Sequence, residues 1–149
     1  MVESFPVLYI LMRTDLDSLN SGKGMAQASH ASNAFVKEMT DIKDAGVIIN
    51  NDQVIINNIN NDLFNKWSTE TTQGFGTVIV LGVNEHEMRT ATMMAIRLGY
   101  TADVIHDPTY PVRDGEICHT LPLDTCAYVF GDKNDPVLGA LLGNFNLHP

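Results

Sequence analysis

The chain has 149 residues, the length of one ordinary domain, and with 44% hydrophobic and 18% charged residues its composition excludes an intrinsically disordered protein. The formal net charge of −9 argues against a general nucleic-acid-binding protein, because phosphate contacts need a basic surface, although it leaves room for one small basic patch. The sequence contains no apolar run of the roughly 18 residues that a membrane-spanning helix requires, so we expect no membrane span.

The first element is a nearly continuous apolar run over residues 5–12. Such a run predicts a strand that is buried on both faces of a sheet covered by helices. The polar residues 13–22 follow, and residues 20–22 offer candidates for a helix N-cap. A helix is predicted over residues 23–39, where apolar residues recur at helical spacing.

Residues 41–62 form an Asn-rich insertion. Two short apolar runs, 47–49 and 54–56, flank the polar residues 50–53, which predicts a β-hairpin outside the common fold. We expect its turn to be mobile, or its edge to pair with another chain. One interpretation of the protein is therefore an interaction protein that offers this edge to a partner strand.

The rest of the chain alternates between buried-strand and helical patterns. Strands are predicted at 77–83, 101–105 and 125–130, and helices at 63–67, 85–98 and 136–142. Residues 106–121 read as a long connection with a tight turn at 114–116. Asn84 and Gly99 mark the start and the end of the middle helix. The alternation predicts a single three-layer α/β/α domain over residues 1–149, with a four-stranded mixed sheet.

The first strand-to-helix junction carries the strongest functional signal, because ligands bind beyond the carboxyl ends of strands in such sheets. Gly22 and Gly24 bracket Lys23 at the start of the helix, where free N–H groups and the helix dipole favour an anion. Lys23, Gln27 and His30 follow one another at i, i+4 and i+7, so they share one stripe of the helix. The stripe is either a reactive surface or a solvated helix face.

Asp107 is the best-placed carboxylate outside this helix. It follows the third predicted strand, where it either faces the stripe or forms a turn. His106 and His119 are candidates to lie near it, although a lone loop histidine is more often a surface residue. Cys118 and Cys126 form no zinc motif and lack a basic neighbour that would make either a nucleophile. Two such cysteines are typical of a reducing cytoplasm, where we expect the protein.

The junction also carries a longer motif, in which Arg-x-Asp-Leu precedes Gly-Lys and Ala-Gln-Ala-Ser-His-Ala. Its residues are Arg13, Asp15, Leu16, Gly22, Lys23, Ala26, Gln27, His30 and Ala31. This motif resembles that of type 2 peptidyl-tRNA hydrolases. The resemblance continues over most of the chain apart from residues 41–62. Ser21 stands where the family usually has a further lysine, and Cys126 stands where one threonine would align.

The resemblance implies hydrolysis of the ester between a peptide and the 3′-terminal ribose of tRNA. It implies that Lys23 contacts a phosphate or the oxyanion, that His30 and Asp107 orient or deprotonate water, and that Gln27 positions the ribose or the carbonyl. The candidates for a hydroxyl are Thr109, Thr120 and Thr125, and the further substrate contacts expected are Arg13, Asp15, Gly22 and Arg113. No metal or organic cofactor is implied, and family members are commonly homodimers.

Three features favour a non-catalytic descendant that binds a small nucleotide or a protein partner instead. The second lysine of the motif is missing, the turn after Asp107 is rebuilt, and the net charge of −9 is unusual for a tRNA enzyme. Whether the protein is an enzyme therefore stays open at this point. Convergence of Arg13, Lys23, Arg113 and Lys133 on one cleft would favour a phosphate ligand.

Overall fold

The computed structural model describes residues 3–45 and 51–149. Strands and helices follow one another as β1 (Pro6–Arg13), α1 (Ser21–Ala45), α2 (Asn51–Ser68), β2 (Val78–Val83), α3 (Glu85–Arg97), β3 (Thr101–Asp114), β4 (Ile117–Asp132) and α4 (Pro136–Leu142). The strands form one sheet in the order β2-β1-β4-β3, in which β1 and β2 are parallel and the other two pairs are antiparallel. The predicted α/β class and four-stranded mixed sheet are confirmed.

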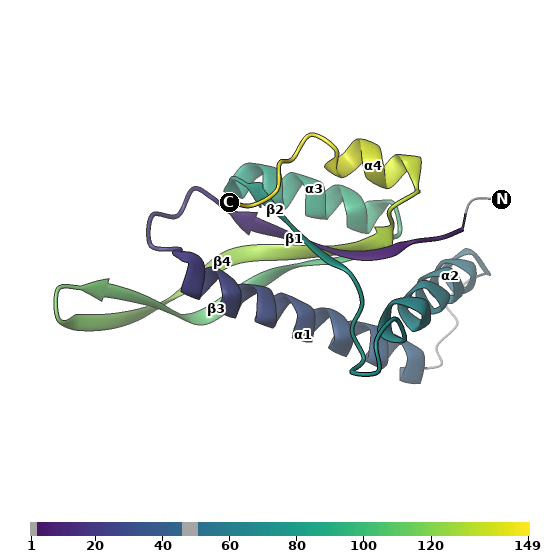
Figure 1. Ribbon diagram of the computed structural model, residues 1–149, viewed down its shortest axis with the longest axis horizontal. Coiled ribbons are helices and arrows are strands. Elements are labelled where there is room, and N and C mark those ends of the chain that lie inside the picture. Colours follow the sequence, from purple (N-terminus) through teal and green to yellow (C-terminus); the bar gives the residue numbers. More distant parts are fainter. Residues whose placement is uncertain (1–2, 46–50) are drawn as a thin grey trace.

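β1 lies inside the sheet and is buried on both faces, as its apolar run predicts. Because side chains alternate along a strand, Leu8, Ile10 and Met12 face α1 and α2, whereas Leu11 faces α3 and α4. Figure 1 shows the two helical layers on opposite sides of the sheet. The core is therefore divided into two apolar clusters, and the three-layer arrangement follows from the two buried faces.

The helix that carries the predicted stripe starts at the end of the sheet where β1 finishes. Asn20 caps it, since its side-chain oxygen accepts a hydrogen bond from the Lys23 N–H at 3.0 Å. α3 starts at a reciprocal capping box between Asn84 and Glu87, and after this helix Gly99 adopts a φ of +91°. Short polar side chains therefore fix the first turn of the helix at both strand-to-helix junctions.

The β-hairpin predicted within residues 41–62 is wrong where the structure describes it. Residues 54–56 lie in α2, while residues 46–50 are outside the described part of the chain. Two three-residue apolar runs are too short to define a period, and helix formation is cooperative. The well-packed turn that includes Leu63 and Trp67 anchors a helix that extends back to Asn51. Without the hairpin, the proposed docking edge for a partner strand is lost.

β3 and β4 continue past the sheet as a long two-stranded arm, which Figure 1 shows extending beyond the other elements. Residues 106–121 were predicted as a connection because Pro108 and Pro111 argue against a strand. The strand nevertheless runs through both prolines: Pro108 lies in a register shift between Asp107 and Tyr110, and Pro111 pairs with Thr120. The predicted turn at 114–116 is confirmed, and Gly115 has a φ of +62° there. None of the described helices is long and apolar enough to cross a bilayer.

Candidate functional site

A cavity of about 480 Å³ lies between α1 and the bulged part of β3. His30 and Ala34 line it from α1, and residues 103–109 line it from β3. Asp107 and His30 therefore line one cavity. Within residues 3–45 and 51–149, no group of three or more His, Cys, Asp or Glu side chains is placed to hold a metal ion.

Asp107 is held by a buried chain of hydrogen bonds. The Gln27 side-chain amide donates to Asp107 Oδ2 at 2.7 Å, and the Thr125 hydroxyl donates to Gln27 Oε1 at 2.6 Å. On the other side of the carboxylate, the Thr109 backbone N–H donates to Oδ1 at 2.9 Å. Gln27 is only 2% exposed and uses both ends of its amide in this chain, so it orients Asp107 and does not face solvent.

The charge of Asp107 follows from these contacts. Burial alone would raise the pKa of Asp107, but hydrogen bonds from Gln27 and Thr109 and the nearby charge of His30 outweigh it and lower the pKa. The group is therefore a carboxylate near neutral pH. Oδ1 accepts bonds from both the N–H and the hydroxyl of Thr109, whereas Oδ2 accepts the Gln27 bond alone and keeps a lone pair for water, beside an exposed imidazole.

Lys23 lies apart from this cavity, against the start of the arm. Its Nζ donates to the carbonyl oxygen of Pro111 at 2.7 Å and lies 5.2 Å from the centre of the Tyr110 ring. Lys23 and Arg113 line a second cavity of about 340 Å³ together with Asn20, Pro111 and Cys118. Two of the four predicted cations thus share one cleft.

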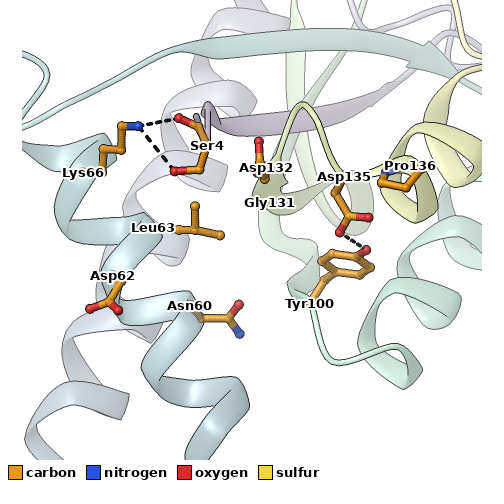
Figure 2. Close-up of a pocket in the computed structure, with 10 residues that line it drawn as sticks. All are labelled: Ser4, Asn60, Asp62, Leu63, Lys66, Tyr100, Gly131, Asp132, Asp135 and Pro136. Atoms are coloured by element: carbon orange, nitrogen blue, oxygen red, sulfur yellow. Dashed lines mark hydrogen bonds between the residues drawn. The ribbon is translucent and has the colours of Figure 1, made fainter. Parts of the chain in front are cut away.

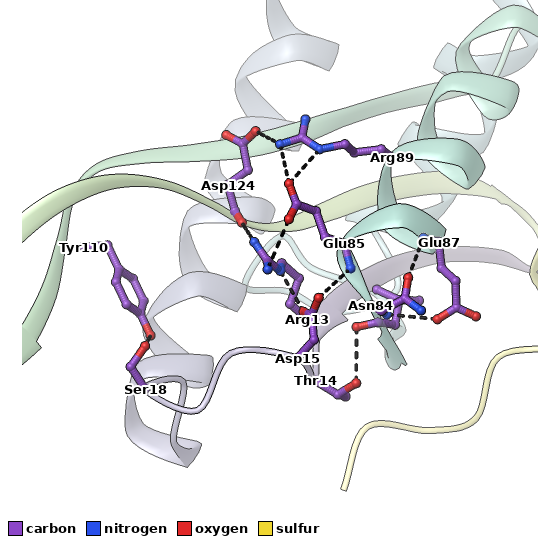
Figure 3. Close-up of polar contacts among 11 residues, drawn as sticks. Arg13, Thr14, Asp15, Ser18, Asn84, Glu85, Glu87, Arg89, Tyr110 and Asp124 are labelled. Carbon is purple, nitrogen blue, oxygen red and sulfur yellow. Dashed lines mark hydrogen bonds and ion pairs between the residues drawn. The ribbon is translucent and has the colours of Figure 1, made fainter.

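Arg13 and Asp15, which are predicted substrate contacts, line neither of these two cavities. Arg13 is 7% exposed, and its guanidinium donates to Asp15 Oδ1 at 2.8 Å and to the Asp124 carbonyl at 3.0 Å (Figure 3). Asp15 also accepts a hydrogen bond from the Glu85 N–H at 3.0 Å. The pair therefore joins the end of β1 to the start of α3, and the Arg13 bond lowers the pKa of Asp15.

Sequence reasoning missed the partners of this ion-pair cluster. Arg89 donates to Asp124 Oδ2 at 2.6 Å, and His106 lies 2.7 Å from Asp124 Oδ1. Burial would raise the pKa of Asp124, but the hydrogen bonds from His106 and Arg89 outweigh it and lower the pKa. The one signal available in the sequence was the position of Asp124 directly before a predicted strand.

The remaining predicted residues lie in different surroundings. Thr120 is exposed on the arm opposite Pro111, away from the cavity at Asp107. Gly22 lies in the first turn of α1, where a Cβ added to it would lie 3.6 Å from Asn20 Oδ1. Lys133 packs over the Phe5 ring at 5.7 Å, so it does not join Lys23 and Arg113.

Cys126 takes no part in chemistry at this site. Burial raises the pKa of its thiol to about 12, so it stays protonated, and its Sγ lies 3.5 Å from the Gln27 carbonyl oxygen. This is the position where a threonine would align in the family motif. A small apolar thiol fills it here and packs in the core with α1.

A larger cavity, of about 600 Å³, contains none of the predicted site residues. It lies beside α2 and the end of β4 (Figure 2). Two of its polar side chains are bonded within the protein, since Lys66 donates to Ser4 and Tyr100 donates to Asp135. These contacts join neighbouring elements, so the functional residues are better sought at Asp107.

A comparison with protein families identifies the family of this chain. The family model described as "Peptidyl-tRNA hydrolase PTH2" matches residues 6–126. The matched range runs from the first residue of β1 into β4, and it includes Lys23, Gln27, His30, Asp107 and Thr125. A comparison with curated proteins finds no match. Because the family model covers well over half of the sequence, the chain belongs to the PTH2 peptidyl-tRNA hydrolase family.

Proposed function

We propose that this protein hydrolyses the ester that joins a peptide to the 3′-terminal ribose of tRNA. The observation that supports this best is the 2.7 Å hydrogen bond from buried Gln27 to Asp107, at a cavity that also contains His30. An ionised, fixed carboxylate beside an imidazole is suited to activating water. Membership of the PTH2 family supports peptidyl-tRNA as the substrate class.

In this proposal Asp107 orients a water molecule and His30 accepts its proton. The water oxygen bonds to the ester carbonyl carbon, and the resulting tetrahedral intermediate then releases the ribose oxygen, to which His30 returns the proton. Both peptide acid and tRNA leave as products, so no further reactant is needed. Thr125 and Gln27 act as positioning residues because they touch Asp107 or each other, and neither is exposed to the cavity.

Lys23 fits a phosphate contact better than an oxyanion contact. It lies seven residues before His30 on α1, which is roughly 10 Å along the helix axis at about 1.5 Å per residue. Arg113 lines the same small cavity, so the two cations together suit the phosphates next to the terminal ribose. The cytoplasmic location and the homodimer stay predictions.

The test is release of peptide from peptidyl-tRNA by the purified protein, with free nucleotides as competitors. Cleavage that saturates with substrate supports the proposal. The separate cavity at Lys23 and Arg113 favours one alternative, a descendant that binds a small nucleotide without catalysis. No cleavage, together with nucleotide binding that Lys23→Ala abolishes, would decide for that alternative.

Lys23→Ala is expected to raise KM while kcat changes little, because the phosphate contact is lost and the carboxylate at Asp107 is untouched. The slope of log(kcat/KM) against log salt concentration should become shallower by roughly 0.7–1, which corresponds to one phosphate contact. The control is Lys37→Ala, an exposed lysine farther along α1 that pairs with Asp41. An equal effect of both variants on the salt slope would contradict the role of Lys23.

Gln27→Leu is expected to raise the pKa of Asp107. In the wild type burial would raise this pKa, but the hydrogen bonds from Gln27 and Thr109 outweigh it and lower it. Without the Gln27 bond the carboxyl should therefore keep its proton up to a higher pH. The measurement is the pH titration of the Asp107 carboxyl carbon by NMR, with folding checked at each pH by circular dichroism. An unmoved titration would count against this positioning role.

A further inference from the structure

The cavity at Asp107 has the free edge of β3 as one wall. In the described part of the chain the sheet order β2-β1-β4-β3 gives β3 a strand partner on one side, which is β4. Residues 103–109, seven consecutive positions of this edge strand, line the cavity opposite His30 and Ala34 of α1. Main-chain groups of an edge strand are therefore accessible beside the carboxylate.

The backbone of this edge has a donor that a second strand could use. The Val104 N–H donates to the carboxylate of Asp103 at 2.8 Å. Such a bond to the preceding side chain is local and is easily exchanged for a bond to another chain. The usable edge ends at Pro108, which has no N–H, so it spans residues 103–107, or roughly 16 Å at about 3.3 Å per residue.

We propose that the peptide part of the substrate binds to this edge as an additional β-strand, with its C-terminal ester at Asp107 and His30. This inference rests on the proposed function. Peptides attached to tRNA differ in sequence, and strand addition recognises the main chain, which all of them share. The edge leads directly to the carboxylate, so a strand that lies on it delivers its ester to the reacting groups.

Two side chains suit this occupant. Ala34 follows His30 by one helical turn, and its small side chain leaves room for a peptide backbone between α1 and β3. Asp103 is exposed and lies four residues, or roughly 13 Å, from Asp107 along the strand. Its carboxylate is placed to attract the terminal ammonium group of a peptide that is three or four residues long.

The test compares substrates that differ only in the peptide. An N-acetyl-aminoacyl-tRNA is too short to lie along the edge and tests the proposed function alone. An N-acetyl-tetrapeptidyl-tRNA should have a kcat/KM about 10- to 100-fold higher, from two or three added main-chain hydrogen bonds. N-methylation of one peptide amide should remove this gain, whereas N-methylation of the adjacent amide should not, because successive N–H groups of a strand point to opposite sides.

A substitution in the protein gives a second measurement. Ala34→Gln places a longer side chain over the edge and should lower the ratio of tetrapeptidyl to aminoacyl kcat/KM within the same variant, towards one. The matched control is Ala140→Gln, which adds the same side chain at an exposed position of α4 on the opposite face of the sheet (Figure 1). Ala140→Gln should keep the ratio of the wild type.

The outcomes separate the two proposals. Hydrolysis of the short substrate with no gain from a longer peptide, or equal loss from both N-methylated positions, overturns strand addition and leaves the hydrolase proposal intact. No hydrolysis of any substrate overturns both. A gain that depends on which of two adjacent amides is methylated supports strand addition, because a merely apolar contact would not distinguish them.

Discussion

Asp107→Asn is expected to lower kcat for peptidyl-tRNA by on the order of 10²–10⁴-fold, the usual contribution of a group that activates water. The substitution keeps the size of the side chain but removes its charge. It also replaces one acceptor oxygen by an NH₂ group, so the bonds from Gln27 and Thr109 no longer both find an acceptor. KM should change little, because Lys23 and Arg113 are unaltered. Single-turnover hydrolysis measures the chemical step.

The matched control is Asp62→Asn, an exposed aspartate on α2 that lines the larger cavity away from Asp107. It should retain kcat within about twofold. His30→Ala should also lower kcat, and the double variant should be little slower than the slower single variant, because both groups act on one water. Independent, multiplying losses would mean that the two residues do not share a step. Retention of kcat within a few-fold by Asp107→Asn would exclude this carboxylate from the reaction.

The parts of the fold that the sequence predicts well are those set by local signals. β1 is a continuous apolar run because it is buried on both faces, and α3 has a capping side chain at one end and a left-handed glycine at the other. The β3–β4 arm has no such signal. Its strands are mostly exposed, so neither alternation nor burial marks them, and Pro108 is a local signal against a strand that the register shifts accommodate.

For the site, too, local signals in the sequence predict some positions and long-range contacts set the others. The i, i+4, i+7 spacing on α1 places Gln27 and His30 on the same side of the helix as Asp107, because a helix fixes the relative direction of its side chains: Gln27 bonds to the carboxylate and His30 lines the cavity beside it. The role of Arg13 could not be predicted in this way. The Arg13 guanidinium forms an ion pair with Glu85 and donates to the carbonyl of Asp124, and both residues are far from Arg13 in the sequence. They come close to it because β1 pairs with β2 and β4. The pairing of β3 with β4 likewise places Asp107 beside Gln27 of α1.

Phe35→Ala is expected to lower the free energy of unfolding by about 3–5 kcal/mol, the range for removing a fully buried phenylalanine. Phe35 is 0% exposed, and its ring centre lies 4.6 Å from that of Phe130 and 5.4 Å from that of Trp67. The substitution therefore leaves a cavity where α1, α2 and β4 meet. Urea unfolding should show a lower midpoint with an unchanged slope.

The control is Met25→Ala on the same helix, because Met25 is 72% exposed and should change the stability by no more than about 0.5 kcal/mol. A loss below about 1 kcal/mol for Phe35→Ala would mean that α2 and the sheet move to fill the cavity that the ring leaves.

Since α1 also carries Gln27 and His30, the activity of Phe35→Ala is a second measurement. Below its unfolding transition it should keep kcat within a few-fold, because the hydrogen bond to Asp107 does not involve Phe35. A large loss of kcat in the folded variant would show that the aromatic cluster holds α1 in the position that the site requires.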